Sequence, residues 1–183
     1  RAPYGAVLTH GFVVDGEGRK MSKSLGNVVA PQEIIDQHGA EILRIWVVSS
    51  DYSEDLRIGP EIVQRQVDAY RRLRNTFRFL LGNLAGFDDS ERLDQSQLPA
   101  LERWVRHRLY ELDAQVRQNV GDFRFHEMFA SLYNFCTVDL SAFYFDVRKD
   151  SLYCDDVTSV RRHAVRTVLD DLFKVLTAWL APV

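Results

Sequence analysis

The chain has 183 residues, of which 46% are hydrophobic and 27% are charged, and its formal net charge at pH 7 is −3. This composition is typical of a soluble globular protein, and the length suits one large domain or two small ones. The negative balance excludes a protein that attracts nucleic acid through a global positive field, so such a partner must meet a local basic patch. No apolar run is long enough to span a membrane, and we expect no membrane partner.

The cysteines and histidines show no metal-ligand spacing. Cys136 and Cys154 form no CxxC pattern, and the five histidines are scattered along the chain. We therefore expect reduced thiols, a cytoplasmic location and no metal site in this chain. The first residue is Arg1 rather than methionine, which we interpret as a cut from a longer protein.

The N-terminal region predicts a short piece of sheet. Residues 6–9 are expected to form a buried strand, and residues 12–14 a second extended stretch that enters the turn Asp15–Gly18. A strand of this kind is stable only beside other strands. The region is therefore predicted to be the edge of a larger nucleotide-binding domain.

A loop rich in hydrogen-bond donors follows the turn, with the sequence Lys20-Met21-Ser22-Lys23-Ser24-Leu25-Gly26-Asn27. Two mobile ammonium groups and two hydroxyls lie close together, and Gly26 frees the backbone. A polyphosphate requires such a set of donors on a loop that can close. The alternative is a solvated basic loop between a strand and a helix.

Apolar residues at helical spacing predict six helices after the loop. Pro31 suits the first turn of the first helix, and Gly39 is expected to end it. Residues 51–55, 86–97 and 147–156 are polar connections. From Pro60 onward four long amphipathic helices predict an antiparallel bundle, so the fold class is mainly α. The expected helix ranges are 31–37, 40–48, 60–84, 99–120, 124–144 and 156–180.

The third of these helices carries a concentration of arginine. Residues 60–85 contain five arginines against Glu61 and Asp68. At 100° per residue, Arg71, Arg74 and Arg78 fall on one flank of the apolar stripe. Such a flank either meets a phosphate backbone or covers apolar surface and pairs with carboxylates, and both interpretations stay open.

The run Lys20–Ser24 matches the KMSKS signature of class I aminoacyl-tRNA synthetases, and the chain resembles that family. Within the family, two stretches point to the isoleucine enzymes over the valine, leucine and methionine enzymes, namely 46–52 and 70–84. His10-Gly11 is a poor match to HIGH, the other class I signature, and we expect a strand end there. Further resemblance lies in residues 8–12, 15–16, 18–27, 135–136 and 141–146.

The resemblance implies a Rossmann-type catalytic domain, of which residues 1–59 are the C-terminal end, and an anticodon-binding helical domain at residues 60–183. It implies ATP with Mg²⁺ and isoleucine as ligands of the parent enzyme, and isoleucine tRNA rather than DNA as the partner. Arg71, Arg74 and Arg78 are the expected tRNA contacts. Lys20 and Lys23 are the expected catalytic residues, and the expected ATP contacts are Lys20, Met21, Ser22, Lys23 and Ser24.

The HIGH motif, the isoleucine pocket and the editing domain of that family are missing from this sequence, so we expect the isolated chain to be inactive. Other interpretations are a valyl- or leucyl-type synthetase fragment, a non-catalytic tRNA-binding module, and a helical interaction protein. The loop favours an enzyme fragment, because an adaptor has no use for it.

Overall fold

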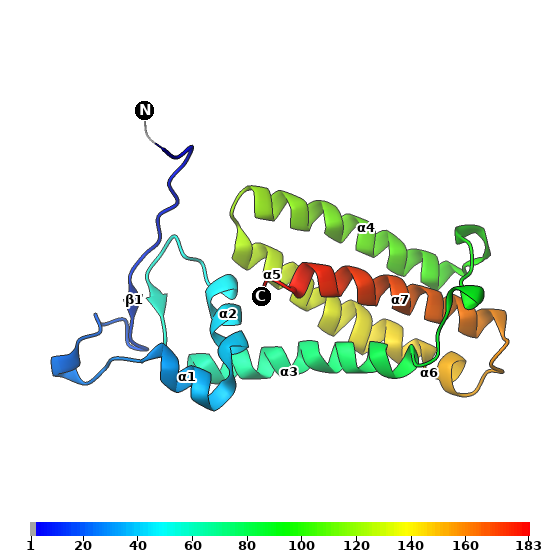
Figure 1. Ribbon diagram of the computed structural model, residues 1–183, viewed down its shortest axis with the longest axis horizontal. Helices are drawn as coiled ribbons and strands as arrows, with labels where there is room; N and C mark the ends of the chain where they lie inside the picture. Colours follow the sequence, from blue (N-terminus) through cyan, green and yellow to red (C-terminus); the bar gives the residue numbers. More distant parts are fainter. Residues whose placement is uncertain (1–2) are drawn as a thin grey trace.

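The computed structural model describes residues 3–183, as a long helical bundle with a smaller unit at one end (Figure 1). The smaller unit holds two short parallel strands, β1 (Val13–Val14) and β2 (Leu56–Arg57), with Val13 paired to Leu56. Two helices, α1 (Pro31–His38) and α2 (Ala40–Ser49), lie beside the strands and share a small core with β2. The prediction of a mainly α fold with a small α/β part is confirmed.

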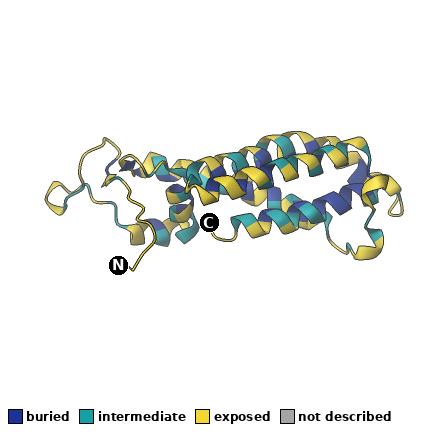
Figure 2. Cartoon of the chain, turned by 90° about the horizontal axis from the view of Figure 1, so that it is seen from above, coloured by how far each residue is buried: buried dark blue, intermediate teal, exposed yellow. Residues whose placement is uncertain are grey.

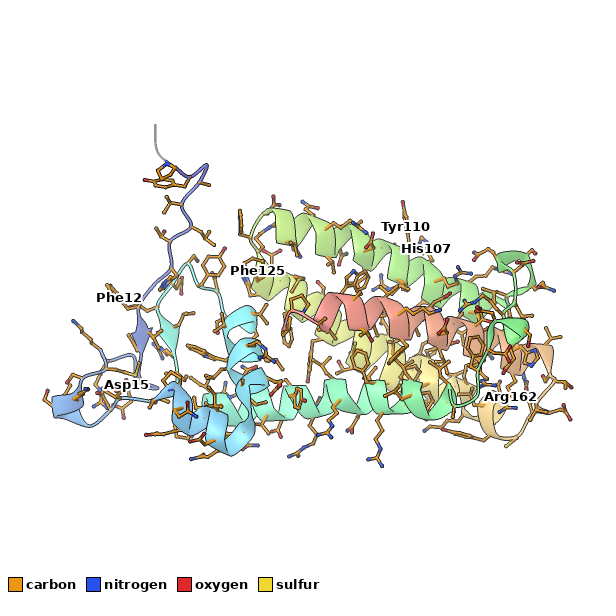
Figure 3. The ribbon with its side chains drawn as sticks, in the orientation of Figure 1. Phe12, Asp15, His107, Tyr110, Phe125 and Arg162 are labelled. Atoms are coloured by element: carbon orange, nitrogen blue, oxygen red, sulfur yellow. The ribbon has the colours of Figure 1, made fainter. Side chains whose placement is uncertain are left out.

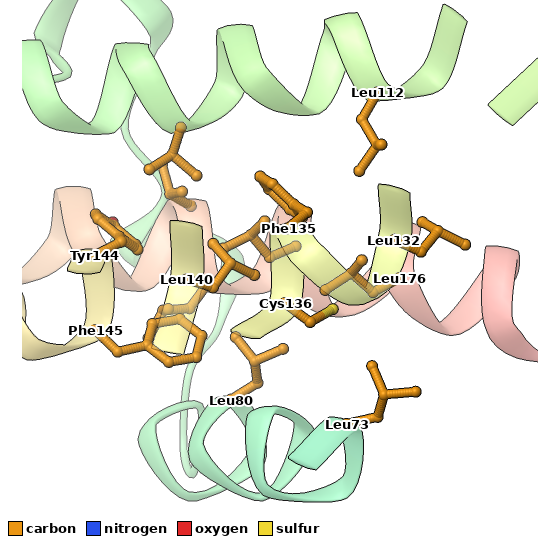
Figure 4. Close-up of a cluster of buried hydrophobic side chains, with 14 of the residues drawn as sticks. Leu73, Leu80, Leu112, Leu132, Phe135, Cys136, Leu140, Tyr144, Phe145 and Leu176 are labelled. Atoms are coloured by element: carbon orange, nitrogen blue, oxygen red, sulfur yellow. The ribbon is translucent and has the colours of Figure 1, made fainter. Parts of the chain in front are cut away.

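The bundle consists of α3 (Pro60–Asn83), α4 (Ala100–Gly121), a continuous helical stretch through α5 (Phe125–Asn134) and α6 (Phe145–Tyr153), and α7 (Val160–Leu180). Their inward faces are buried along the whole length of the bundle, whereas the outer faces are exposed (Figure 2). Leu80 of α3, Leu132 of α5 and Leu176 of α7 are 0% exposed and belong to one core (Figure 4). Apolar stripes at helical spacing therefore explain how these helices pack.

A π-helical segment, Phe135–Tyr144, joins α5 to α6. The Ser141 hydroxyl donates to the carbonyl of Cys136, five residues earlier, at 2.8 Å, and it lies 3.0 Å from the Thr76 hydroxyl of α3. These side-chain bonds satisfy polar groups at the wider turn, where α3 packs against the segment.

The polar connection predicted at 147–156 is wrong, because the helix continues to Tyr153. Arg148 of this stretch turns inward, and its Nε and second terminal nitrogen each donate to Glu102 at 2.7 Å. Glu102 is 0% exposed and also accepts from the Tyr144 hydroxyl at 3.2 Å. Arg148 is therefore part of a helix and pairs with a buried carboxylate inside the bundle.

The predicted start of the last helix at Asp156 is also wrong, since α7 begins at Val160. The Asp156 carboxylate accepts from the backbone N–H and the hydroxyl of Thr158, at 2.8 and 2.7 Å, which favours a turn over a helix. Val157 and Val160, the first apolar residues of the predicted helix range, are 65% and 60% exposed.

The buried strand predicted at residues 6–9 is wrong as well. These residues are exposed and lie outside both strands, because β2 pairs with β1 and not with them. A second, smaller core instead holds this unit together, with Ile34, Ile42, Trp46, Leu56, Ile58 and Val63. Within residues 3–183, no helix is both long and apolar enough to cross a membrane.

Candidate functional site

The donor-rich loop begins at a buried carboxylate. Asp15 follows β1, is 6% exposed, and accepts backbone hydrogen bonds from Glu17 at 3.0 Å and Arg19 at 2.8 Å. Its other oxygen accepts from the Asn27 side-chain amide at 2.9 Å and from Arg19 Nε at 2.9 Å. The bonds from Asn27 and from the Arg19 backbone hold the pKa of Asp15 well below its usual range.

Asn27 closes the loop from its other end. Its side-chain amide nitrogen donates to Asp15 and to the Lys20 carbonyl, at 2.9 and 3.3 Å, and its oxygen accepts from the Ser22 backbone at 2.9 Å. Lys20 also pairs with Val14 in an isolated antiparallel bridge. This Asp15–Asn27 clamp fixes both ends of the loop against β1. Asp15 is labelled beside the loop in Figure 3.

The centre of the loop is a single 3-10 turn, Lys23–Leu25. The Ser22 hydroxyl accepts from the Leu25 backbone at 3.2 Å and lies 2.9 Å from the Ser24 hydroxyl. Gly26 ends the turn at φ +66°, a left-handed conformation that favours glycine. The sequence therefore builds a compact loop with its hydroxyls on one side.

The two lysines of the loop are free. Lys20 and Lys23 are exposed, and neither side-chain ammonium group makes an ion pair or a hydrogen bond within residues 3–183. Met21 differs, because it is half-buried and packs against the smaller core. Free ammonium groups beside the Ser22 and Ser24 hydroxyls fit the needs of a phosphate-bearing ligand.

Arg71, Arg74 and Arg78 all lie exposed on α3, and this arginine flank is separate from the loop. Arg71 makes a weak ion pair with Asp68 at 3.7 Å, whereas Arg74 and Arg78 have none in the described part of the chain. Arg74 borders a cavity of about 260 Å³, and Arg78 a shallow groove of about 400 Å³. In the side-chain view, long side chains of α3 project away from the bundle (Figure 3).

Sequence reasoning missed the roles of Asp15 and Asn27. Both stand in the stretches that resemble the synthetases, but they are twelve residues apart and each is also an ordinary turn residue. Histidine, cysteine and acidic side chains do not gather into a group of three that could hold a metal anywhere in residues 3–183.

Two family models match the chain. Residues 1–59 match the tRNA synthetases of class I (I, L, M and V), and residues 102–183 match the anticodon-binding domain of tRNA ligase. The chain belongs to the class I tRNA synthetases. The resemblance carried by the KMSKS run is thereby confirmed at the level of the family.

Curated synthetases resemble the chain over its whole length. An isoleucine–tRNA ligase of Ruegeria pomeroyi is 57% identical over 184 residues, and that of Caulobacter vibrioides is 57% identical over 183 residues. In both cases the match covers 100% of this chain and 19% of the relative, so the chain spans about a fifth of its relatives' length. The predicted likeness to the isoleucine enzymes is confirmed.

A solved synthetase has the same fold. The structure is a ternary complex described as LeuRS–tRNA–LeuAMS, from Agrobacterium radiobacter K84. It matches with a TM-score of 0.70 at 22% identity, over 94% of this chain and 20% of that chain. The chain therefore shares its overall fold with part of that synthetase.

Proposed function

We propose that the chain is the part of an isoleucine–tRNA ligase that supplies the KMSKS loop and a tRNA-binding helical bundle. The full-length enzyme uses ATP to attach isoleucine to its tRNA in the cytoplasm. In this proposal residues 1–59 end the catalytic domain and residues 60–183 form the anticodon-binding domain. Identities of 53–57% to curated isoleucine–tRNA ligases support isoleucine over valine and leucine.

The observation that carries the proposal is the state of Lys20 and Lys23. Both ammonium groups are exposed and unpaired in the described chain, on a loop whose two ends are fixed by the Asp15–Asn27 clamp. Positive charge placed in advance stabilises the negative charge that develops on phosphate oxygens in a transition state. A charge of this kind is best delivered by a loop that closes over the substrate.

ATP, with Mg²⁺, is the phosphate-bearing substrate of this proposal and supplies the activating phosphoanhydride. Lys23 neutralises charge on the departing pyrophosphate most directly, and Lys20 assists from the beginning of the loop. Ser22 and Ser24 contribute hydroxyl donors. Met21 anchors the loop to the smaller core, against which its side chain packs.

The arginine flank is the proposed contact with tRNA. Arg74 and Arg78 are exposed without an ion pair in residues 3–183, in a chain whose net charge is −3. Arg148 and Arg166, which point into the bundle, are paired with carboxylates, so unpaired arginines on an exposed flank favour an external partner. Phosphate groups of an RNA backbone provide the matching charge.

Substitution of the loop lysines in the full-length ligase tests the proposal. Lys23→Ala should lower the rate of isoleucine-dependent ATP–pyrophosphate exchange by about 100- to 1,000-fold, as expected for loss of a transition-state donor. Lys20→Ala should lower the rate less. Lys149→Ala, which removes an exposed lysine paired with Asp146, is the control and should exchange like the parent.

Exchange at the parent rate in Lys23→Ala would show that the loop has no catalytic role. In that case a non-catalytic tRNA-binding module becomes the better description, provided that tRNA binding persists and weakens with salt. Exchange that depends on valine or leucine instead of isoleucine would move the chain to one of those enzymes. The isolated 183-residue chain is expected to give no exchange, since two lysines without a held ATP stabilise nothing.

A further inference from the structure

The loop at residues 50–55, between α2 and β2, contacts both the bundle and the strand that leads to the KMSKS loop. Tyr52 in this loop makes one hydrogen bond in each direction. Its hydroxyl donates to the carbonyl of Phe123, in the turn between α4 and α5, and its own carbonyl accepts from the Gly11 backbone at 2.9 Å. Tyr52 thus contacts both regions.

On the bundle side, Tyr52 meets a turn in an uncommon conformation. Phe123 has φ +58°, and no other non-glycine residue in the described chain has a positive φ. The Phe125 ring lies beside both, with its centroid 6.3 Å from that of Tyr52 and 6.2 Å from that of Phe123. Phe125 stands at the start of α5 (Figure 3). Bulky residues rarely adopt this region without surrounding contacts that hold them there. The turn is therefore held by contacts to which Tyr52 contributes the hydrogen bond.

On the loop side, the same segment sets the position of β1. The Phe12 backbone donates to the Asp55 carboxylate at 2.8 Å, and its carbonyl accepts from Leu56 at 2.7 Å. A Cβ atom on Gly11 would lie 2.1 Å from the Glu54 carbonyl oxygen, so only glycine allows this approach. β1 then runs directly into Asp15, which holds Asn27 and the KMSKS loop.

We propose that Tyr52 is a positioning residue that sets the KMSKS loop relative to the tRNA-binding bundle and transmits tRNA binding to that loop. The inference rests on the proposed function, since it requires a tRNA on the bundle and a reaction at the loop. The contacts run without a break from Phe123 through Tyr52, Gly11 and β1 to Asp15. Coupling requires that both sites bias the same element, and here that element is the segment at residues 50–55.

Hydrogen exchange of the loop amides, residues 20–27, tests the coupling in the full-length ligase with and without tRNA. In the parent, tRNA should slow this exchange about fivefold or more, a typical size for coupled sites. Tyr52→Phe keeps the ring and removes only the hydroxyl. In this variant the slowing of exchange by tRNA should be about threefold smaller than in the parent, which corresponds to the loss of one hydrogen bond. The Kd for tRNA should stay within about twofold of the parent value.

Tyr110→Phe is the matched control, because Tyr110 is 75% exposed on α4 and its hydroxyl makes no hydrogen bond within residues 3–183 (Figure 3). It should behave like the parent. The proposal is overturned if tRNA leaves exchange of residues 20–27 unchanged in the parent, or if Tyr52→Phe responds like Tyr110→Phe. A ligase that neither binds tRNA nor forms adenylate would instead refute the proposed function.

A merely structural role of Tyr52 predicts a different pattern. It would raise exchange at residues 20–27 and in α5 equally, with or without tRNA, and would leave the tRNA-dependent difference at its parent value. That outcome also overturns the proposal.

Discussion

The interior of the bundle and the KMSKS loop hold positive charge in opposite ways. Arg166, with 7% of its side chain exposed, contacts the Glu91 carboxylate at 2.6 Å and donates to the carbonyls of Asn83 and Ala85. Lys20 and Lys23 are exposed and make no such bond in residues 3–183. A buried cation requires full pairing, whereas an exposed one adds little to stability. Interior charges therefore hold the fold, and loop charges are available to a ligand.

The largest effect expected from this contrast is on stability. Glu102→Ala leaves the Arg148 guanidinium without its carboxylate in a place where its side chain is 15% exposed. Loss of one partner of a buried ion pair costs about 3–5 kcal/mol. Hydrogen exchange of α4 and α6 amides in the full-length ligase measures the local free energy of opening.

Lys149→Ala again serves as the control, because its pair with Asp146 lies at the surface and both side chains are more than half exposed. In this variant the α4 and α6 amides should exchange at the parent rate. If Glu102→Ala also exchanged like the parent, the interior pair would not be what holds α4 to α6, and the contrast between the two regions would be lost.

The next effect concerns the loop itself. Asn27→Ala removes the bonds to Asp15, to the Lys20 carbonyl and to the Ser22 backbone, but no charge. Because catalytic groups displaced by about 1 Å can cost about 100-fold, we expect ATP–pyrophosphate exchange to fall about 10- to 100-fold. Exchange of α4 and α6 amides should stay unchanged. Asn75→Ala, an exposed amide on α3, is the matched control.

The pH dependence of amide protection in the loop tests the role of Asp15. The pKa of Asp15 is lowered in the folded protein, so folding favours its charged form. Its contribution is present above the usual value of 3.8 and is lost only as the pH falls below that value toward the folded pKa. Protection of loop amides should therefore be the same at pH 5 as at pH 7. Loss of protection between these values would contradict the role of Asp15.

Much of the fold could be predicted from sequence, because apolar residues at helical spacing specify helices without knowledge of their partners. The exceptions are polar residues with interior partners. From sequence, Arg148 is predicted to lie in a loop, because its hydrogen-bond acceptor, Glu102, is on another helix. Residues 6–9 show the reverse error, since apolar composition alone does not supply a neighbouring strand.

The candidate site divides in the same way. Lys20 and Lys23 could be proposed from sequence, because the role proposed for them depends on residue type and close spacing. The Asp15–Asn27 clamp could not, because its hydrogen bond joins residues on either side of the loop and exists only after the loop has folded. The helical flank of Arg74 and Arg78 follows from periodicity, but their lack of carboxylate partners required the packed helices.

The smallest expected effect is on tRNA binding, and it tests whether the exposed arginines of α3 resemble the loop lysines or the interior arginines. Each phosphate contact removed should lower the slope of log affinity against log salt by roughly one unit. Arg74→Ala and Arg78→Ala should therefore weaken tRNA binding a few-fold at low salt, and equally for matched and mismatched tRNA, because phosphate contacts carry no sequence information.

Arg71→Ala is the internal comparison, since Arg71 already pairs with Asp68 at 3.7 Å and should lose less affinity. The stability of α3 should be unchanged in all three variants, because none of these arginines makes an ion pair with another helix within residues 3–183. If Arg74→Ala and Arg78→Ala instead opened α3 more readily and bound tRNA like the parent, these arginines would serve the fold. Altered discrimination between matched and mismatched tRNA would assign them to bases rather than to phosphates.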